Sequence, residues 1–116
     1  MKKLLALSIF AVSGITASAA DMECKVSTGQ WNTNHCFYFD YSMNKNQKPA
    51  YFRLTNVTKT ISDIIWKKAT SSCSSSSSNC QINIRPYRTY EGEATVLYSD
   101  GTYETLSASA SFETGF

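Results

Sequence analysis

Hydrophobic and polar residues alternate most regularly between Gly92 and Phe112. Because successive side chains of a strand point to opposite faces, this period of two predicts two β-strands joined by a turn at Ser99-Asp100-Gly101. The apolar set on one face would be Ala94, Val96, Tyr98, Leu106, Ala108, Ala110 and Phe112, with Ser107, Ser109 and Ser111 on the other. Such one-sided alternation is typical of an antiparallel hairpin that is covered on one face.

Two registers compete for this hairpin. A two-residue Asp100-Gly101 turn would bring Val96 to face Thr105 and would mix apolar with polar residues. A three-residue loop pairs Val96 with Glu104 and keeps the apolar side chains together. It also puts Gly101 at the left-handed position after a type I turn, where a Cβ would clash. We therefore expect the three-residue loop.

Shorter strand patterns precede this hairpin, at residues 23–26, 35–41, 50–57, 60–67 and 81–86. The segment 60–67 also fits helical spacing, but its isoleucines and its shortness favour a strand. Polar, turn-rich stretches separate these segments. About seven short strands in a chain of this length predict an all-β fold, an immunoglobulin-like antiparallel β-sandwich.

The first twenty residues have the pattern of a cleaved signal peptide. Lys2 and Lys3 precede an apolar run that is too short to span a bilayer, and Ala17-Ser18-Ala19 matches the small-residue rule for cleavage after Ala19 or Ala20. No later stretch is long and apolar enough for a membrane span. We expect residues 21–116 to form one β-sandwich domain that is secreted or periplasmic, and the leader is bacterial in style.

Removing the leader changes the charge balance. The whole chain has 11 Lys plus Arg against 9 Asp plus Glu, and two of the lysines lie in the leader. The mature chain would be formally neutral, so the sequence predicts no basic surface for nucleic acid.

Four cysteines, all in the mature part, predict two disulfides in an exported protein. Of the three possible pairings we expect the local ones, Cys24–Cys36 and Cys73–Cys80, because each pair brackets a loop between expected strands. The second pair would close five serines into a small ring, as a stapled hairpin tip or as a loop presented to a partner. Zinc binding is disfavoured because no Cys-x-x-Cys pair is present and the single His35 adjoins Cys36. We expect no metal and no cofactor.

The sequence contains no catalytic constellation that would indicate an enzyme. Glu91 and Glu93 would share a strand face, as two carboxylates do in glycoside cleavage, but no positioning group accompanies them. His35 has no nucleophile-elbow serine, and cysteines in disulfides cannot attack a substrate.

Aromatic residues point instead to binding. Tyrosine and tryptophan give rigid contact area with a polar edge, which suits sugars and protein partners. The expected contact residues are Trp31, Tyr87, Arg88 and Tyr90, for a cell-surface glycan or a protein partner. Alternatively, Trp31 packs over the edge of the core and the two tyrosines cap the rim of the sandwich. A hydrolase inhibitor that presents the Cys73–Cys80 loop is the second functional hypothesis, and a surface-assembly subunit is the third.

The stretch Gly92–Thr102, together with Ser107–Phe112, resembles the final hairpin of bacterial immunoglobulin-like modules, which occur as accessory domains of secreted enzymes and surface proteins. The resemblance covers about a quarter of the mature chain. It implies a scaffold fold and transfers no functional residue, because fold alone does not assign function. The inter-sheet Cys…Trp…Cys layout of antibody domains is missing. Usher-type pilins share this sandwich, but the expected mature start is too short for their donor strand.

Overall fold

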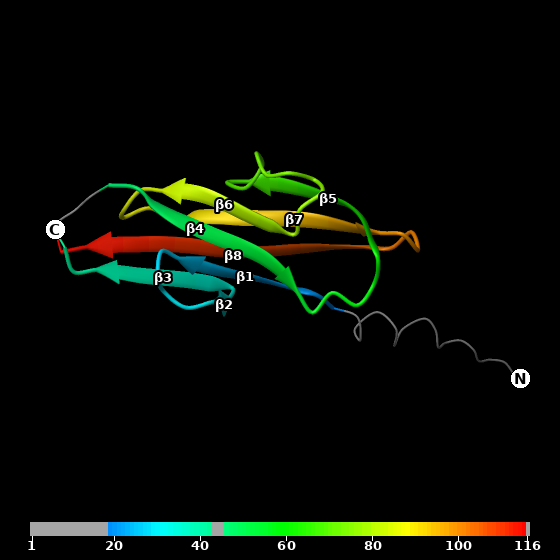
Figure 1. Cartoon of the computed structure of the whole chain (residues 1–116), viewed down its shortest axis with the longest axis horizontal. Helices are drawn as coiled ribbons and strands as arrows, with labels where there is room; N and C mark the ends of the chain where they lie inside the picture. Colours follow the sequence, from blue (N-terminus) through cyan, green and yellow to red (C-terminus); the bar gives the residue numbers. More distant parts are fainter. Residues whose placement is uncertain (1–18, 43–45, 116) are drawn as a thin grey trace, which may run out of the picture.

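The computed structural model describes residues 19–42 and 46–115, and these residues form eight strands. The strands are β1 (Asp21–Val26), β2 (Asn32–Thr33), β3 (His35–Asp40), β4 (Lys48–Thr55), β5 (Ile61–Lys68), β6 (Asn79–Ile84), β7 (Tyr90–Tyr98) and β8 (Tyr103–Thr114). They make two four-stranded sheets, ordered β2-β1-β4-β6 and β3-β8-β7-β5. We call these sheet A and sheet B. The expected β-sandwich is confirmed (Figure 1).

The C-terminal hairpin has the register that the apolar pattern predicted. Val96 faces Glu104 in the β7–β8 ladder, and the Tyr98 backbone N–H donates to the Thr102 carbonyl at 2.8 Å. Gly101 has φ of 90°, a backbone conformation that is costly for a residue with a Cβ. The three-residue loop is therefore confirmed.

The core lies between the inner faces of the two sheets. Sheet B contributes the inward side chains of β5, β7 and β8 with Cys36 of β3, and sheet A contributes those of β1, β4 and β6. Its largest fully buried members are Phe52 of β4 and Phe112 of β8. The segment 61–68 is a strand, as expected, and it buries Ile64 and Trp66 while Ile65 stays exposed.

Both expected disulfides are present, Cys24–Cys36 and Cys73–Cys80. Cys24 is on β1 of sheet A and Cys36 is on β3 of sheet B, so the first bridge joins the two sheets. This cross-link could not be seen from the sequence, because the sheet to which each strand belongs was unknown. Structural disulfides indicate an oxidising, extracytoplasmic environment.

The structure differs from the expected antiparallel arrangement at one pair of strands. β3 pairs with β8 in parallel, with His35 opposite Ser109 and Asp40 opposite Thr114. The chain crosses from β2 in sheet A to β3 in sheet B at Asn34, whose φ of 67° allows the sharp change of direction. The two-residue strand β2 was also not expected, because its residues are polar. No helix in the described residues is long and apolar enough to cross a membrane.

An ion pair fastens the end of β3 to the start of β4. Lys48 Nζ lies 2.8 Å from Asp40 Oδ2, and the Ser42 backbone N–H donates to Asp40 Oδ1 at 2.9 Å. Hydrogen bonding from Lys48, and then from Ser42, lowers the pKa of Asp40 from 3.8 to about 2.

This lowered pKa predicts a pH-dependent contribution to stability. A carboxylate with a depressed folded-state pKa stabilises the protein above its unfolded value, and the contribution is lost as the pH falls through the folded value. Asp40→Asn should therefore lower stability at neutral pH, and the difference from wild type should shrink between pH 3.8 and about 2. Urea denaturation at stepped pH measures this, with the exposed Asp63→Asn as control. A difference that stays constant across the window would contradict the assignment.

Candidate binding site

The outer face of sheet A carries two rows of polar and aromatic side chains. In one row Lys25 lies opposite Tyr51, which lies opposite Gln81; the next row is Glu23, Arg53 and Asn79. Because side chains alternate along a strand, these six residues point away from the core. Their neighbours Cys24, Phe52 and Cys80 are buried.

Trp31 lies over these two rows. The Arg53 guanidinium carbon is 3.8 Å from the centre of the Trp31 ring, and the Tyr51 ring centre is 6.5 Å away at an interplanar angle of 56°. The turn after β1 places Trp31 there. The Gly29 N–H donates to the Val26 carbonyl at 2.9 Å, so the chain turns back towards β1 before β2 begins.

The charges of this face are partly paired. Arg53 Nη2 is 2.7 Å from Glu23 Oε1, and Nε donates to the same oxygen at 2.9 Å. This double contact holds the guanidinium over the indole ring, a position that arginine favours. Lys25 Nζ lies 5.1 Å from the Trp31 ring centre and 5.4 Å from that of Tyr51. In residues 19–42 and 46–115, Lys25 has no carboxylate partner within 4.0 Å.

A shallow cavity of ≈ 270 Å³ adjoins the tryptophan. It is lined by Trp31, Tyr51, Phe52, Asn79, Cys80 and Gln81. Aromatic rings thus bound a space that two side-chain amides also reach. Amides both donate and accept hydrogen bonds, and aromatic faces accept C–H surfaces. This combination can hold a ligand that presents hydroxyl groups on an apolar ring.

The structure does not bring the four expected contact residues together. Trp31 lies over sheet A, whereas the Tyr87 hydroxyl donates to the Thr114 carbonyl of β8 in sheet B at 2.8 Å. The Tyr90 hydroxyl accepts from the Arg85 backbone N–H at 3.1 Å, and its ring packs against the core. Arg88 is exposed. Both tyrosines therefore hold the connection between β6 and β7 in place, while Tyr87 remains 53% exposed. A role of this segment in binding stays a prediction.

Sequence reasoning did not pick out the neighbours of Trp31. The strand expected at residues 50–57 is confirmed, and its alternation places Tyr51 and Arg53 on the face opposite the buried Phe52. The missing information was the order of the strands, because Lys25 and Gln81 join Tyr51 only through pairing of β4 with β1 and β6. The alternation of apolar and polar residues along one strand shows which of its side chains are exposed. It does not show which residues of the neighbouring strands lie beside them, because those strands come from distant parts of the chain.

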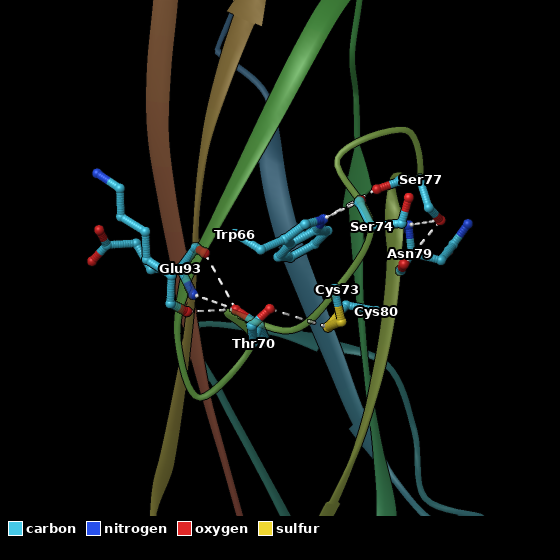
Figure 2. Close-up of a disulfide and its surroundings, with 9 residues drawn as sticks. Trp66, Thr70, Cys73, Ser74, Ser77, Asn79, Cys80 and Glu93 are labelled. Atoms are coloured by element: carbon cyan, nitrogen blue, oxygen red, sulfur yellow. Dashed lines mark hydrogen bonds between the residues drawn. A yellow bond between two sulfur atoms is a disulfide. The ribbon is translucent and has the colours of Figure 1, made fainter.

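The serine ring closed by Cys73 and Cys80 is held against the protein. Trp66 Nε1 donates to the carbonyls of Ser74 and Ser77 at 3.1 and 3.2 Å, and Figure 2 shows the indole pointing to both. Trp66 is 5% exposed, so the loop covers its polar edge. A second cavity of ≈ 360 Å³ lies between this loop and the start of β5. The ring is thus a fixed loop whose backbone satisfies a buried donor.

A separate group of exposed aromatic residues lies on the edge strand β3 and just beyond its end. Phe37 is 52% exposed and Phe39 is 38% exposed, and the Phe39 and Tyr41 ring centres are 4.9 Å apart. Their exposure on a sheet edge is the feature that a surface-assembly subunit would need.

Comparison with known proteins assigns no relative: no protein-family model, curated protein or solved structure matches the chain.

Proposed function

We propose that this protein is a non-catalytic module that recognises a glycan through the outer face of sheet A. The observation that carries the proposal is the cavity beside Trp31, in which aromatic rings lie next to the amides of Asn79 and Gln81. Small-ligand sites combine apolar and aromatic walls with a few polar groups that fix orientation. We further propose that the protein is secreted or periplasmic in a bacterium, which the disulfides and the leader pattern support.

The chemistry of the site fits a sugar ring. The C–H face of a pyranose packs on Tyr51 or Trp31 and removes apolar surface from water. Its hydroxyls exchange hydrogen bonds with Asn79 and Gln81, which lie next to the aromatic rows on β6. One stacked sugar with a few hydrogen bonds corresponds to a Kd of about 1 mM, or about −4 kcal/mol. A polymer with repeated units raises the apparent affinity through avidity.

Removing Trp31 tests the proposal. We expect Trp31→Ala to weaken binding to an insoluble polysaccharide about 5- to 150-fold, because loss of a central aromatic contact costs about 1–3 kcal/mol. Co-sedimentation with peptidoglycan and a panel of insoluble polysaccharides measures the bound fraction. Tyr103→Ala is the matched control, since Tyr103 is an exposed aromatic residue, 67% accessible, on sheet B.

Fluorescence gives an independent readout at the same site. Trp66 is buried, so a Trp66→Phe variant leaves the half-buried Trp31 as the reporter. Saturable binding with a change in its emission would support the proposal. Unchanged binding by a folded Trp31→Ala protein would refute it. Loss of binding in Tyr87→Ala alone would move the site to the connection between β6 and β7.

A second candidate function is inhibition of a hydrolase by the serine ring. The observation that favours it is the fixed shape of the loop, held by its disulfide and by the two hydrogen bonds from Trp66. Pre-organised loops lose little entropy on binding. Cys73→Ser opens the ring and leaves Cys80, which lines the cavity beside Trp31, in place. This variant separates the two functions, because glycan binding should persist while inhibition should disappear.

A further inference from the structure

Glu104 of β8 receives hydrogen bonds from two distant parts of the chain. Its Oε1 accepts from the Ala20 backbone N–H at 3.1 Å, and its Oε2 accepts from the Tyr98 hydroxyl at 2.6 Å. The carboxylate is half-buried. Across the described residues, no lysine or arginine lies within 4.0 Å of it. Both donors are neutral, so a partly buried negative charge has no cation beside it.

Ala20 lies at the boundary between the domain and what precedes it. Its side chain is 3% exposed, whereas Ala19 is exposed. β1 begins at the next residue, Asp21, which pairs with Thr55. The domain therefore includes Ala20 as a packed residue, whereas Ala19 is exposed.

We propose that the peptide bond between Ala19 and Ala20 is a processing site, and that the ammonium group released on Ala20 binds the Glu104 carboxylate. An endopeptidase that recognises small residues, acting on Ala17-Ser18-Ala19, would add water across this bond. The Ala19 carbonyl becomes a carboxylate, and the Ala20 nitrogen becomes a primary amine that is protonated at neutral pH. The nitrogen already lies at the carboxylate, so no rearrangement is needed.

The same contacts choose between the two cleavage positions that the sequence left open. Cleavage after Ala20 would remove a buried methyl group and would take one donor away from Glu104. Cleavage after Ala19 keeps the methyl group in place and adds a positive charge 3.1 Å from Oε1. Charge-assisted hydrogen bonds are about twice as strong as neutral ones. The mature domain therefore begins at Ala20.

Tyr98 strengthens the arrangement. Its side chain is 4% exposed, and burial followed by the hydrogen bond to Glu104 raises the pKa of Tyr98 to about 12. The hydroxyl thus remains a donor to the carboxylate at every pH at which the ammonium exists. The two donors use different oxygens of Glu104, so the ammonium need not compete with Tyr98.

Direct identification of the N-terminus is the first test. The full chain is produced with export in a bacterium, and the purified protein is analysed by intact mass and N-terminal sequencing. The expected first residues are Ala-Asp-Met. A sequence that begins Asp-Met-Glu, or a retained leader, would overturn the proposed position.

A thermodynamic cycle tests the ammonium itself. Two chains, one beginning at Ala20 and one at Ala19, are released from a fusion partner by a protease that leaves no extra residue. Each is made with Glu104 and with Glu104→Gln. In the longer chain the Ala20 nitrogen is again a neutral amide, which makes it the matched control.

We expect Glu104→Gln to lower Tm by about 5 °C more in the chain that begins at Ala20 than in the longer chain. A structural role of Glu104 through Tyr98 alone would lower Tm equally in both chains, and that result would overturn the proposed ammonium contact. If the Glu104→Gln proteins fail to fold, comparing the Tm values of the two chains that keep Glu104 still tests the ammonium contact. The chain that begins at Ala20 should have the higher Tm at low salt, and equal values would contradict the proposal.

Discussion

Replacing Cys24 and Cys36 together by alanine is expected to lower the free energy of unfolding by about 3–5 kcal/mol. The bridge closes a loop between residues 12 apart, and a cross-link of this size restricts the unfolded chain by about 3 kcal/mol. Both cysteines are also fully buried, so their removal leaves unfilled space between the sheets. A small domain with about 5–15 kcal/mol of total stability would lose a large share of it.

The second disulfide is the matched control for the first. Cys73–Cys80 closes a shorter loop of sequence separation 7, and Cys73 is only half-buried. Urea denaturation of the double variants Cys24→Ala/Cys36→Ala and Cys73→Ala/Cys80→Ala should therefore show the larger loss for the first. Equal losses, or a larger loss at the serine ring, would show that joining the two sheets adds nothing to stability.

Replacing Gly92 by alanine is expected to cost about 2–3 kcal/mol through overpacking. Gly92 lies in β7, and a Cβ built there would be 2.8 Å from the Phe52 ring and 2.9 Å from Thr70 Cγ2. Phe52 comes from the opposite sheet and is 1% exposed, so its ring has little room to move. Absence of a side chain at Gly92 thus creates the space that the phenylalanine ring fills.

A double variant identifies the cause of the loss. Gly92→Ala combined with Phe52→Leu should be less destabilised than the sum of the two single changes, because the smaller side chain relieves the contact. Gly101→Ala is the control. Nothing lies within 4 Å of a Cβ at that position, and its cost comes from the positive φ, so Phe52→Leu should not rescue it. Additive effects for Gly92 and Phe52 would contradict the steric explanation.

Local patterns were sufficient for much of the fold. The alternation around Val96 and the glycine in the turn determined the hairpin register. The local cysteine pairings were expected because each pair brackets a loop between expected strands. Non-local information was missing. Nothing near His35 or Ser109 indicates that their strands pair in parallel, because such pairing depends on how distant segments meet in space.

The candidate site was also predicted only in part from the sequence. Trp31 was expected as a contact residue because a tryptophan side chain gives rigid contact area, and this role remains a prediction. Its neighbours are spread over three strands that are distant in sequence, so only the sheet order assembles them. Tyr87 and Tyr90 were also expected contact residues, and their hydroxyls form hydrogen bonds with Thr114 of β8 and with the Arg85 backbone.

The parallel pairing of β3 with β8 sets the order of events during folding. His35 and Ser109 are 74 positions apart, so β3 leaves the ribosome long before the strand beside which it lies. Pairing between strands that are distant in sequence slows folding and leaves intermediates that can aggregate. Phe37 and Phe39 lie on β3, which remains unpaired with β8 until β8 has been synthesised. The Cys24–Cys36 bridge is local and can form first, tying β3 to β1. Sheet B can be completed only after residue 114 has been synthesised, so this domain folds as a whole after synthesis of its last strand.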